Sequence, residues 1–192
     1  MQTTLDGARF RRIMSRFATG VTVVTTSADG QIHGMTCNAF CSISMTPFTV
    51  MVCLAKNSRT ERLIEKSGVF AVNILSDSQT SLSDRFAGRN KEFDQNRFDG
   101  FSWRKALTGS PIFEPSLAYL DCKLMKSFDG TTHTIYLGEV ITAEADENQR
   151  PLIFYESRYT SLDSSNPLAK NQDRAADYSG IVLPERKSQT GD

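Results

Sequence analysis

The sequence has no excess of charge of either sign. Lys plus Arg and Asp plus Glu each number 22 among its 192 residues, so the formal net charge is zero. A protein that binds nucleic acid largely through its phosphates needs a basic surplus to neutralise them. We therefore expect no nucleic-acid partner.

Long apolar runs are missing as well. The best candidate, Phe48 to Ala55, is far shorter than the roughly 18 residues that a membrane helix requires. The N-terminal stretch MQTTLDGARFRRIM is charged from its sixth residue, and it lacks the apolar stretch and the cleavage site of a secretion signal. The sequence therefore predicts a cytoplasmic protein that does not contact a membrane.

Metal-ligating residues are scarce. The chain has two histidines and four cysteines, and it contains no CxxC pair. His33, Cys37 and Cys41 lie close together in the sequence, but their spacing is not that of known zinc sites. Without a secretion signal, the cysteines are expected to be reduced thiols. We expect neither a metal site nor a disulfide framework.

Both common nucleotide-binding motifs are absent. The sequence has no GxGxxG and no GxxxxGK[ST], which are the fingerprints of the Rossmann fold and the P-loop. If a nucleotide binds to this chain, a different structural motif must hold it.

The composition is that of a folded protein, with 39% hydrophobic and 23% charged residues. A chain of this length predicts one principal domain, because domains commonly run to about 100–200 residues. We place this domain at residues 1–162. Residues 163–192 are rich in Ser, Asn, Asp, Arg and Lys and predict a polar tail, disordered alone or ordered against a partner.

Strand patterns dominate the principal domain. β-branched, alternating or continuously apolar segments bounded by turn residues predict strands at 20–28, from about 32, and at 48–55, 69–75, 116–128, 133–145 and 151–157. Residues 88–113 are rich in Gly, Asn, Asp and Pro, and we expect them to be irregular. The fold class is therefore mainly β, an antiparallel barrel, closed or partly closed, with a few short helices.

Short helices are predicted at 6–19, at 58–68 and after Ser76. The first has apolar residues at helical spacing (Phe10, Ile13, Met14 and Phe17), with Asp6 as its N-cap. The second begins with Ser58 and has Glu61 three residues later, a capping box, and Gly68 supplies its left-handed end.

The stretch HGMTCNAFCSIS (33–44) is unusually polar for a segment between buried strands. If it is one extended strand, Thr36 and Asn38 share a face, which would be small and polar. Such a face suits a flat ligand, and the Asn38 amide offers both a donor and an acceptor to a ring edge. The alternative is an ordinary solvent-facing strand side, since antiparallel sheets often have one wet face.

A second candidate site is the helix start Lys56-Asn57-Ser58-Arg59-Thr60. The free amides and the positive dipole end of a helix attract phosphate, and hydroxyls and cations at the same turn can add hydrogen bonds. The alternative is plain capping by Ser58 with solvated cations. Together, the polar row and this turn describe a flat polar heterocycle attached to a phosphate.

The ordered series of motifs in the chain resembles the flavin reductase family, and the likeness covers roughly residues 8–162. The segments that carry it are HGMTCNAFCSIS, KNSRT (56–60), GVFAVNIL (68–75), the Gln79 to Phe86 helix, RFDGF (97–101), TGSPIF (108–113), LAYLDC (117–122), HTIYLGEV (133–140) and PLIFYESRY (151–159). These proteins are the small NAD(P)H:flavin oxidoreductases of two-component flavin-dependent monooxygenases.

The resemblance implies a homodimer of antiparallel Greek-key split β-barrels that bind FMN or FAD. Such a reductase transfers a hydride from NADH or NADPH to the flavin, and the reduced flavin diffuses to a partner monooxygenase. Two alternatives remain at the level of the sequence, because fold alone does not fix function. One is a flavoenzyme with tightly bound flavin and its own organic substrate. The other is a non-enzymatic flavin-binding interaction module.

The resemblance also implies cofactor contacts. The ring and its ribityl chain would lie along Thr36, Asn38, Ala39 and Ser42, and the phosphate by Lys56, Asn57, Ser58 and Thr60. Further contacts would come from Phe70, Asn73, Arg89 and Tyr159. Phe70 could instead simply pack in the core, and Tyr159 could instead close the barrel together with Tyr155.

His133 is the predicted catalytic residue, again by resemblance. The family usually has Gly-Asp-His before the GEV strand, and its histidine is associated with the nicotinamide nucleotide. This chain has Gly130-Thr131-Thr132-His133, so the histidine is retained and the acid is replaced. A threonine hydroxyl can orient an imidazole but cannot stabilise its charge. The alternative is a surface histidine next to a turn.

Overall fold

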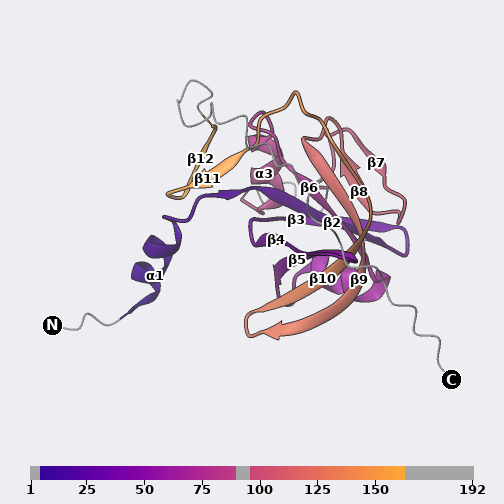
Figure 1. Cartoon of the computed structure of the whole chain (residues 1–192), viewed down its shortest axis with the longest axis horizontal. Coiled ribbons are helices and arrows are strands. Elements are labelled where there is room, and N and C mark those ends of the chain that lie inside the picture. Colours follow the sequence, from indigo (N-terminus) through magenta and orange to yellow (C-terminus); the bar gives the residue numbers. More distant parts are fainter. Residues whose placement is uncertain (1–4, 90–95, 163–192) are drawn as a thin grey trace. The chain divides into compact units, whose positions relative to one another are not determined.

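A computed structural model describes residues 5–89 and 96–162 (Figure 1). The predicted tail, 163–192, lies outside the described residues. The helices within them are α1 (Gly7–Met14), α2 (Arg59–Ser67) and α3 (Thr80–Phe86). The strands are β1 (Thr19–Gly20), β2 (Thr22–Ala28), β3 (Gln31–Cys37), β4 (Phe40–Met45), β5 (Phe48–Ala55), β6 (Val69–Ile74), β7 (Trp103–Lys105), β8 (Pro111–Phe113), β9 (Ala118–Gly130), β10 (His133–Ala145), β11 (Ile153–Tyr155) and β12 (Arg158–Thr160).

The main sheet curls into a barrel. Its strands lie in the order β3-β2-β6-β9-β10-β5-β4, and every neighbouring pair is antiparallel. β3 and β4 are the two edges of this sheet, yet only Asn38 and Ala39 connect them, so the edges must approach each other. The Ala39 carbonyl accepts a hydrogen bond from the Cys53 amide at 3.1 Å, which extends the β4–β5 pairing into the connection between the two edges. The prediction of a mainly β, antiparallel split barrel is confirmed.

Two hydrophobic clusters lie on opposite faces of β2, because successive side chains of a strand point to opposite sides. Val24 packs inside the barrel with Phe70 and Tyr136. Val23 faces the other way and packs with Phe86 and a second group of aromatic residues. β2 is therefore almost completely buried along its length.

Gly138 on β10 is a point of close approach within the barrel. A Cβ atom at this position would overlap the ring of the buried Phe70 and would lie 3.0 Å from the Cβ of Cys122. Because Phe70 fills the space that a side chain would need, only glycine fits here without a shift of the core.

The α2 helix forms as its sequence predicts. The Ser58 Oγ accepts a hydrogen bond from the Glu61 amide at 3.1 Å, and Gly68 ends the helix with a left-handed φ of 67°. Leu63 and Ile64 are buried, and the helix packs against β2 and β3. The helix therefore covers the barrel beside its seam.

The first helix is shorter than predicted. α1 ends at Met14 because the chain turns there, and Thr19, expected within the helix, instead forms β1 with Gly20 and pairs with β11. The Asp6 side chain caps α1 by accepting a hydrogen bond from the Arg9 amide at 2.7 Å. No α1 residue is buried, and its apolar side chains stay exposed (Phe10, Ile13 and Met14).

Three other predictions were wrong. Residues 33–44 are not one strand, because the chain leaves β3 at Cys37 and enters β4 at Phe40 on the opposite edge. The predicted strand 151–157 is instead part of the β11–β12 hairpin, which Glu156 and Ser157 turn with φ values of 49° and 61°. The region 88–113 holds the short β7–β8 pair, in which Trp103 lies opposite Phe113.

Candidate functional site

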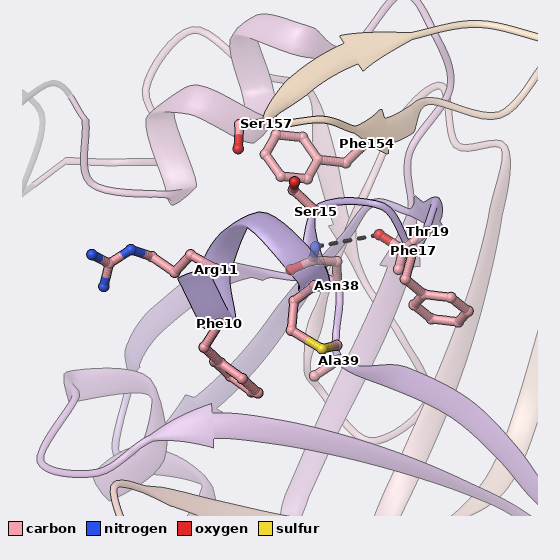
Figure 2. Close-up of a pocket in the computed structure, with 10 residues that line it drawn as sticks. Phe10, Arg11, Ser15, Phe17, Thr19, Asn38, Ala39, Phe154 and Ser157 are labelled. Carbon is pink, nitrogen blue, oxygen red and sulfur yellow. Dashed lines mark hydrogen bonds between the residues drawn. The ribbon is translucent and has the colours of Figure 1, made fainter. Parts of the chain in front are cut away.

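A cavity of about 430 Å³ lies at the barrel seam (Figure 2). Asn38 and Ala39, the two residues that connect the sheet edges, line it together with Thr19. The remaining lining residues come from α1 and the turn after it, and from β11 and its hairpin turn: Phe10, Arg11, Met14, Ser15, Phe17, Phe154 and Ser157. Sequence patterns do not place α1 or β11 at this cavity, since apolar residues at helical or strand spacing are equally typical of a core.

Asn38 presents its amide to this cavity. The side chain is exposed, and its Nδ2 donates a hydrogen bond to Thr19 Oγ1 at 3.2 Å, drawn as a dashed line in Figure 2. Within the described residues this is the one hydrogen bond of the side chain. The carbonyl oxygen and the second amide hydrogen can therefore pair with the edge of a ligand.

Thr36 and Ser42 do not join Asn38 in one polar surface. Thr36 Oγ1 donates to the Ser83 carbonyl of α3 at 2.6 Å, so its hydroxyl is engaged within the protein. Ser42 is exposed on β4, at the opposite edge of the sheet, where it lines a separate and largely apolar hollow. The polar row of the sequence is therefore divided among three environments.

The start of α2 lies against β3. Thr60 is completely buried, and its Oγ1 lies 2.8 Å from Nδ1 of His33. Ser58 lies 3.8 Å from the sulfur of Met35. His33 and Met35 face α2 whereas Thr36 faces α3, as strand alternation requires. Thr36, a predicted ring contact, and the start of α2 thus lie on opposite faces of the edge strand β3.

Acidic groups already occupy the N-terminal turn of α2. Lys56 Nζ pairs with Asp129 Oδ1 at 2.5 Å, and the Asn57 amide donates to Glu61 Oε2 at 2.6 Å. The hydrogen bond from Lys56 and a second one from the Thr131 amide lower the pKa of Asp129. An incoming phosphate would therefore share the positive end of this helix with the Glu61 carboxylate.

His133 stands at the tip of the β9–β10 hairpin, opposite Ala55 on β5. Its Nδ1 lies 2.9 Å from Thr132 Oγ1, so the threonine that replaces the family's acid does hold the imidazole. The Lys56 amide donates to the Thr132 carbonyl at 3.1 Å. The hairpin tip that carries the imidazole is therefore held next to the start of α2.

Arg89 and Tyr159 come together on α3. The Tyr159 hydroxyl lies 2.9 Å from Ser83 Oγ and donates to Asp84 Oδ1, also at 2.9 Å. Arg89 Nη1 pairs with the same Asp84 oxygen at 2.8 Å. Burial is the main cause that raises the pKa of Tyr159. Ser83 and Asp84 were missed, because nothing in a short helix pattern marks them as anchors.

Phe70 and Asn73 are completely buried on β6. Asn73 Nδ2 donates to the Val23 carbonyl at 3.1 Å, and its Oδ1 accepts from the Phe113 amide at 2.9 Å. The Phe70 ring packs in the barrel core. A contact between either side chain and a ligand would require the core to open.

The cysteines are all free thiols, and burial raises the pKa of Cys37 to about 11. Within residues 5–89 and 96–162, no group of three or more His, Cys, Asp or Glu side chains is arranged to hold a metal ion. None of the helices described there has the length and apolar character needed to span a membrane.

Comparison with known proteins decides the family. Residues 14–163 match the family described as flavin reductase like domain. The chain belongs to this flavin reductase-like family. The match spans the barrel and the β11–β12 hairpin, and it begins at the last residue of α1.

Three relatives illustrate the similarity. The reductase subunit HsaB of a flavin-dependent monooxygenase from Rhodococcus jostii (strain RHA1) is 39% identical over 159 residues, which cover 83% of this chain and 80% of that protein. An NADH-dependent flavin reductase from a Rhodococcus species is 35% identical over 156 residues, covering 80% and 85% of the two chains. The solved structure of the flavin reductase PheA2 in its native state is 36% identical, with a TM-score of 0.76 and coverage of 83% and 99%.

The residues at the seam of this flavin reductase-like barrel fit a flavin ring. The cavity has apolar and aromatic walls from Phe10, Met14 and Phe154, against which a planar ring can pack. Asn38 supplies a donor and an acceptor, which the pyrimidine edge of a flavin can meet. A volume of about 430 Å³ lies in the range typical of small-molecule sites.

Proposed function

We propose that the chain is the reductase component of a two-component flavin-dependent monooxygenase, using NADH or NADPH to reduce FMN or FAD. The family match over the whole barrel, with relatives of this activity at 35–39% identity, is the observation that carries the proposal. The names of the relatives favour NADH as the nicotinamide coenzyme.

The flavin ring would lie in the seam cavity. There the Asn38 amide would pair with the ring edge, while Phe154 and the α1 side chains would cover its faces. Ala39 has a small side chain and lets a ring come close to the backbone at the seam. In such enzymes the nicotinamide supplies a hydride that the flavin accepts, and the protein contributes orientation and polarity.

The phosphate of the flavin would lie at the start of α2. Ser58 is half-buried there beside Met35 of β3, and Asn57 is exposed, so the Ser58 hydroxyl and the Asn57 side chain would offer donors to the phosphate. Because the seam cavity and the start of α2 are both adjacent to β3, an edge strand of the sheet, the ligand would pass along that edge. Thr60 would act indirectly, through its hydrogen bond to His33.

His133 would meet the nicotinamide nucleotide. Its exposed imidazole lies at a hairpin tip that the Lys56 amide ties to the start of α2, so it stands near the proposed phosphate position. Thr132 would fix the direction of the ring through the bond to Nδ1. The role of this histidine is binding and orientation, since hydride transfer requires no side-chain acid or base.

A second copy of the chain would complete the molecule. A helix of eight residues is not stable alone in water, yet Ile13 of α1 is 54% exposed, and Phe17, in the segment that follows the helix, is 69% exposed. Further apolar side chains are exposed on β4 and β5 (Ile43, Met45 and Phe48). Apolar patches of this kind are typical of protein interfaces, and they support a homodimer.

Reduced flavin would leave the reductase and diffuse to the oxygenase. An open cavity at a sheet seam, lined by a helix without buried residues, suits release of the flavin better than permanent retention. The reaction would take place in the cytoplasm, with which the free thiols agree.

The test is oxidation of NADH and of NADPH by the purified protein, with FMN and FAD each added in turn. Flavin-dependent oxidation of NADH is the expected result. Flavin that survives desalting, together with negligible oxidation of either nucleotide, would contradict the proposal and favour an enzyme with its own organic substrate.

A further inference from the structure

Asp84 on α3 holds two side chains that the sequence assigned to the cofactor site. Its Oδ1 accepts a hydrogen bond from the Tyr159 hydroxyl at 2.9 Å and another from Arg89 Nη1 at 2.8 Å. The Cζ of Arg89 lies 5.7 Å from the centroid of the Tyr159 ring. One carboxylate oxygen therefore sets the approach of both donors.

Stability is a poor explanation for this cluster. The Arg89 and Asp84 side chains are 57% and 45% exposed, and ion pairs in such positions contribute little to folding. A shared acceptor nevertheless fixes direction, because each donor must point at the same atom. The cluster therefore acts mainly on the position of Tyr159.

Tyr159 connects the cluster to the seam cavity. Its ring packs edge-to-face against Phe154, with the ring centroids 5.7 Å apart and the planes at 60°. The two residues also lie opposite each other in the β11–β12 pair. Phe154 lines the same cavity as Asn38, as Figure 2 shows. A continuous path of contacts thus runs from Asp84 through Tyr159 to the cavity wall.

The hairpin that carries Phe154 has little backbone support of its own. β11 and β12 have three residues each, and they form a separate sheet with the two-residue strand β1. Sheets of such short strands are marginal in water. The Tyr159 anchor therefore adds to the few backbone hydrogen bonds that hold the hairpin, such as the one from the Glu156 amide to the Ser15 carbonyl at 2.9 Å.

We propose that Asp84 is a positioning residue for the aromatic wall of the cavity. Through the hydroxyl of Tyr159 it holds Phe154 where a planar ring packs against it, without touching that ring. The identity of the ring as a flavin rests on the proposed function, whereas the path of contacts does not.

The experiment measures FMN affinity by quenching of flavin fluorescence in the full-length protein. Y159F keeps the aromatic ring and loses the hydroxyl, and D84A removes the acceptor. Each should weaken FMN binding about tenfold, the usual effect of losing a hydrogen bond to a charged group. D84N should lose less, because the amide oxygen still accepts from the hydroxyl.

Double variants separate positioning from a general loss of structure. Y159F/D84A should bind FMN no more weakly than Y159F, since both changes remove the Tyr159–Asp84 bond and the Arg89 bond, lost only in D84A, does not reach Phe154. F154A/Y159F should bind no more weakly than F154A if Tyr159 acts through Phe154. D77N is the matched control. It removes the charge of Asp77, whose Oδ2 lies 2.9 Å from Arg150 Nη2 in an ion pair outside the seam cavity. This variant should leave FMN affinity unchanged.

Wild-type FMN affinity in Y159F and D84A would overturn this inference and leave the proposed function standing. Additive losses in the F154A background would also overturn it, because Tyr159 would then act on the fold and not through Phe154. A wild-type protein that binds neither FMN nor FAD would overturn the proposed function, and the inference with it.

Discussion

At the scale of single residues, the chain has an uncharged hydroxyl next to His133 in place of the carboxylate that the family resemblance leads us to expect. Thr132 stands where the resemblance leads us to expect an acid, and its Oγ1 lies 2.9 Å from Nδ1 of His133. A hydroxyl can donate or accept, so it can hold the imidazole in either protonation state. A carboxylate would favour the charged imidazole, which a threonine does not.

The Thr132 bond can be tested with two substitutions. Thr132→Val removes the hydroxyl at nearly constant shape and should lower kcat/KM for NADH about fivefold to tenfold, the effect of one lost hydrogen bond. Thr132→Ser keeps the hydroxyl and should retain most of the activity. Steady-state kinetics at saturating flavin measures both variants, and equal rates in the two would contradict this role.

Gly138 offers a prediction about the barrel core. Gly138→Ala would force its methyl group into the Phe70 ring and should lower the free energy of unfolding by about 1–3 kcal/mol, the usual cost of overpacking. Gly20→Ala is the control, because a Cβ at Gly20 meets no atom within 4 Å. Denaturant unfolding compares the two, and an equal effect would show that Phe70 has room to move.

Sequence patterns could assign some of the site residues but not others. Ser58 could be predicted as a cap, because capping depends only on neighbours along the chain. Phe154 and Phe10 could not be placed at the cavity, because their positions depend on how distant segments meet. Asn73 reads as a polar residue in a strand, and only the structure reveals its buried partners.

At the scale of elements, the start of α2 combines a cap with a proposed phosphate position. The Glu61 carboxylate accepts from the Asn57 amide at 2.6 Å and from Thr134 Oγ1 at 2.7 Å. It therefore places a negative charge where the helix dipole would favour a phosphate. The same Glu61 carboxylate thus stabilises the start of the helix and would oppose a phosphate at the proposed position, and these two effects are in balance.

Glu61→Gln tests this balance. The amide oxygen can still accept one of the two hydrogen bonds, while the negative charge is lost. FMN affinity should rise severalfold, because a like charge near the phosphate is removed. Riboflavin, which has no phosphate, is the matched control ligand and should bind as before. Equal changes in the affinities for FMN and riboflavin would show that the phosphate binds elsewhere.

Element prediction succeeded where local signals were strong and failed at tight reversals. The 58–68 helix and the 133–145 strand have clear caps, turns and periodicity, and both form as predicted. The hairpin within 151–157 was not predicted. Its turn residues, Glu156 and Ser157, have positive φ angles, which usually indicate Gly or Asn, so the sequence contains no turn signal there. The break between β3 and β4 was missed because the connection, Asn38 and Ala39, is only two residues long and contains neither Gly nor Pro to mark a turn.

At the scale of the whole molecule, the barrel brings distant segments to one seam. Two residues join the edges of a seven-stranded sheet, and the cavity forms where these residues pass from one edge to the other. The family resemblance anticipated this fold, whereas periodicity alone indicated only an antiparallel barrel. The place of α1 beside the cavity is a property of the assembled fold.

The exposed face of α1 predicts the oligomeric state. Light scattering after gel filtration should give a mass near twice 21.4 kDa for the wild type. Ile13→Glu should shift the protein toward the monomer, because a charge in an apolar interface is costly. Leu107→Glu is the control, since Leu107 is 76% exposed and lies between β7 and β8. A monomeric wild type would contradict the dimer.

The central claim, a flavin-dependent reductase with its flavin site at the barrel seam, is tested most directly by NADH oxidation in wild type and Asn38→Leu. The wild type should oxidise NADH only when FMN or FAD is added. Asn38→Leu loses the amide that faces the cavity and should need about tenfold more flavin for half-maximal rate, with its fold intact by circular dichroism. Flavin-dependent rates that are the same in both proteins would contradict the seam site, and no oxidation by the wild type would contradict the function.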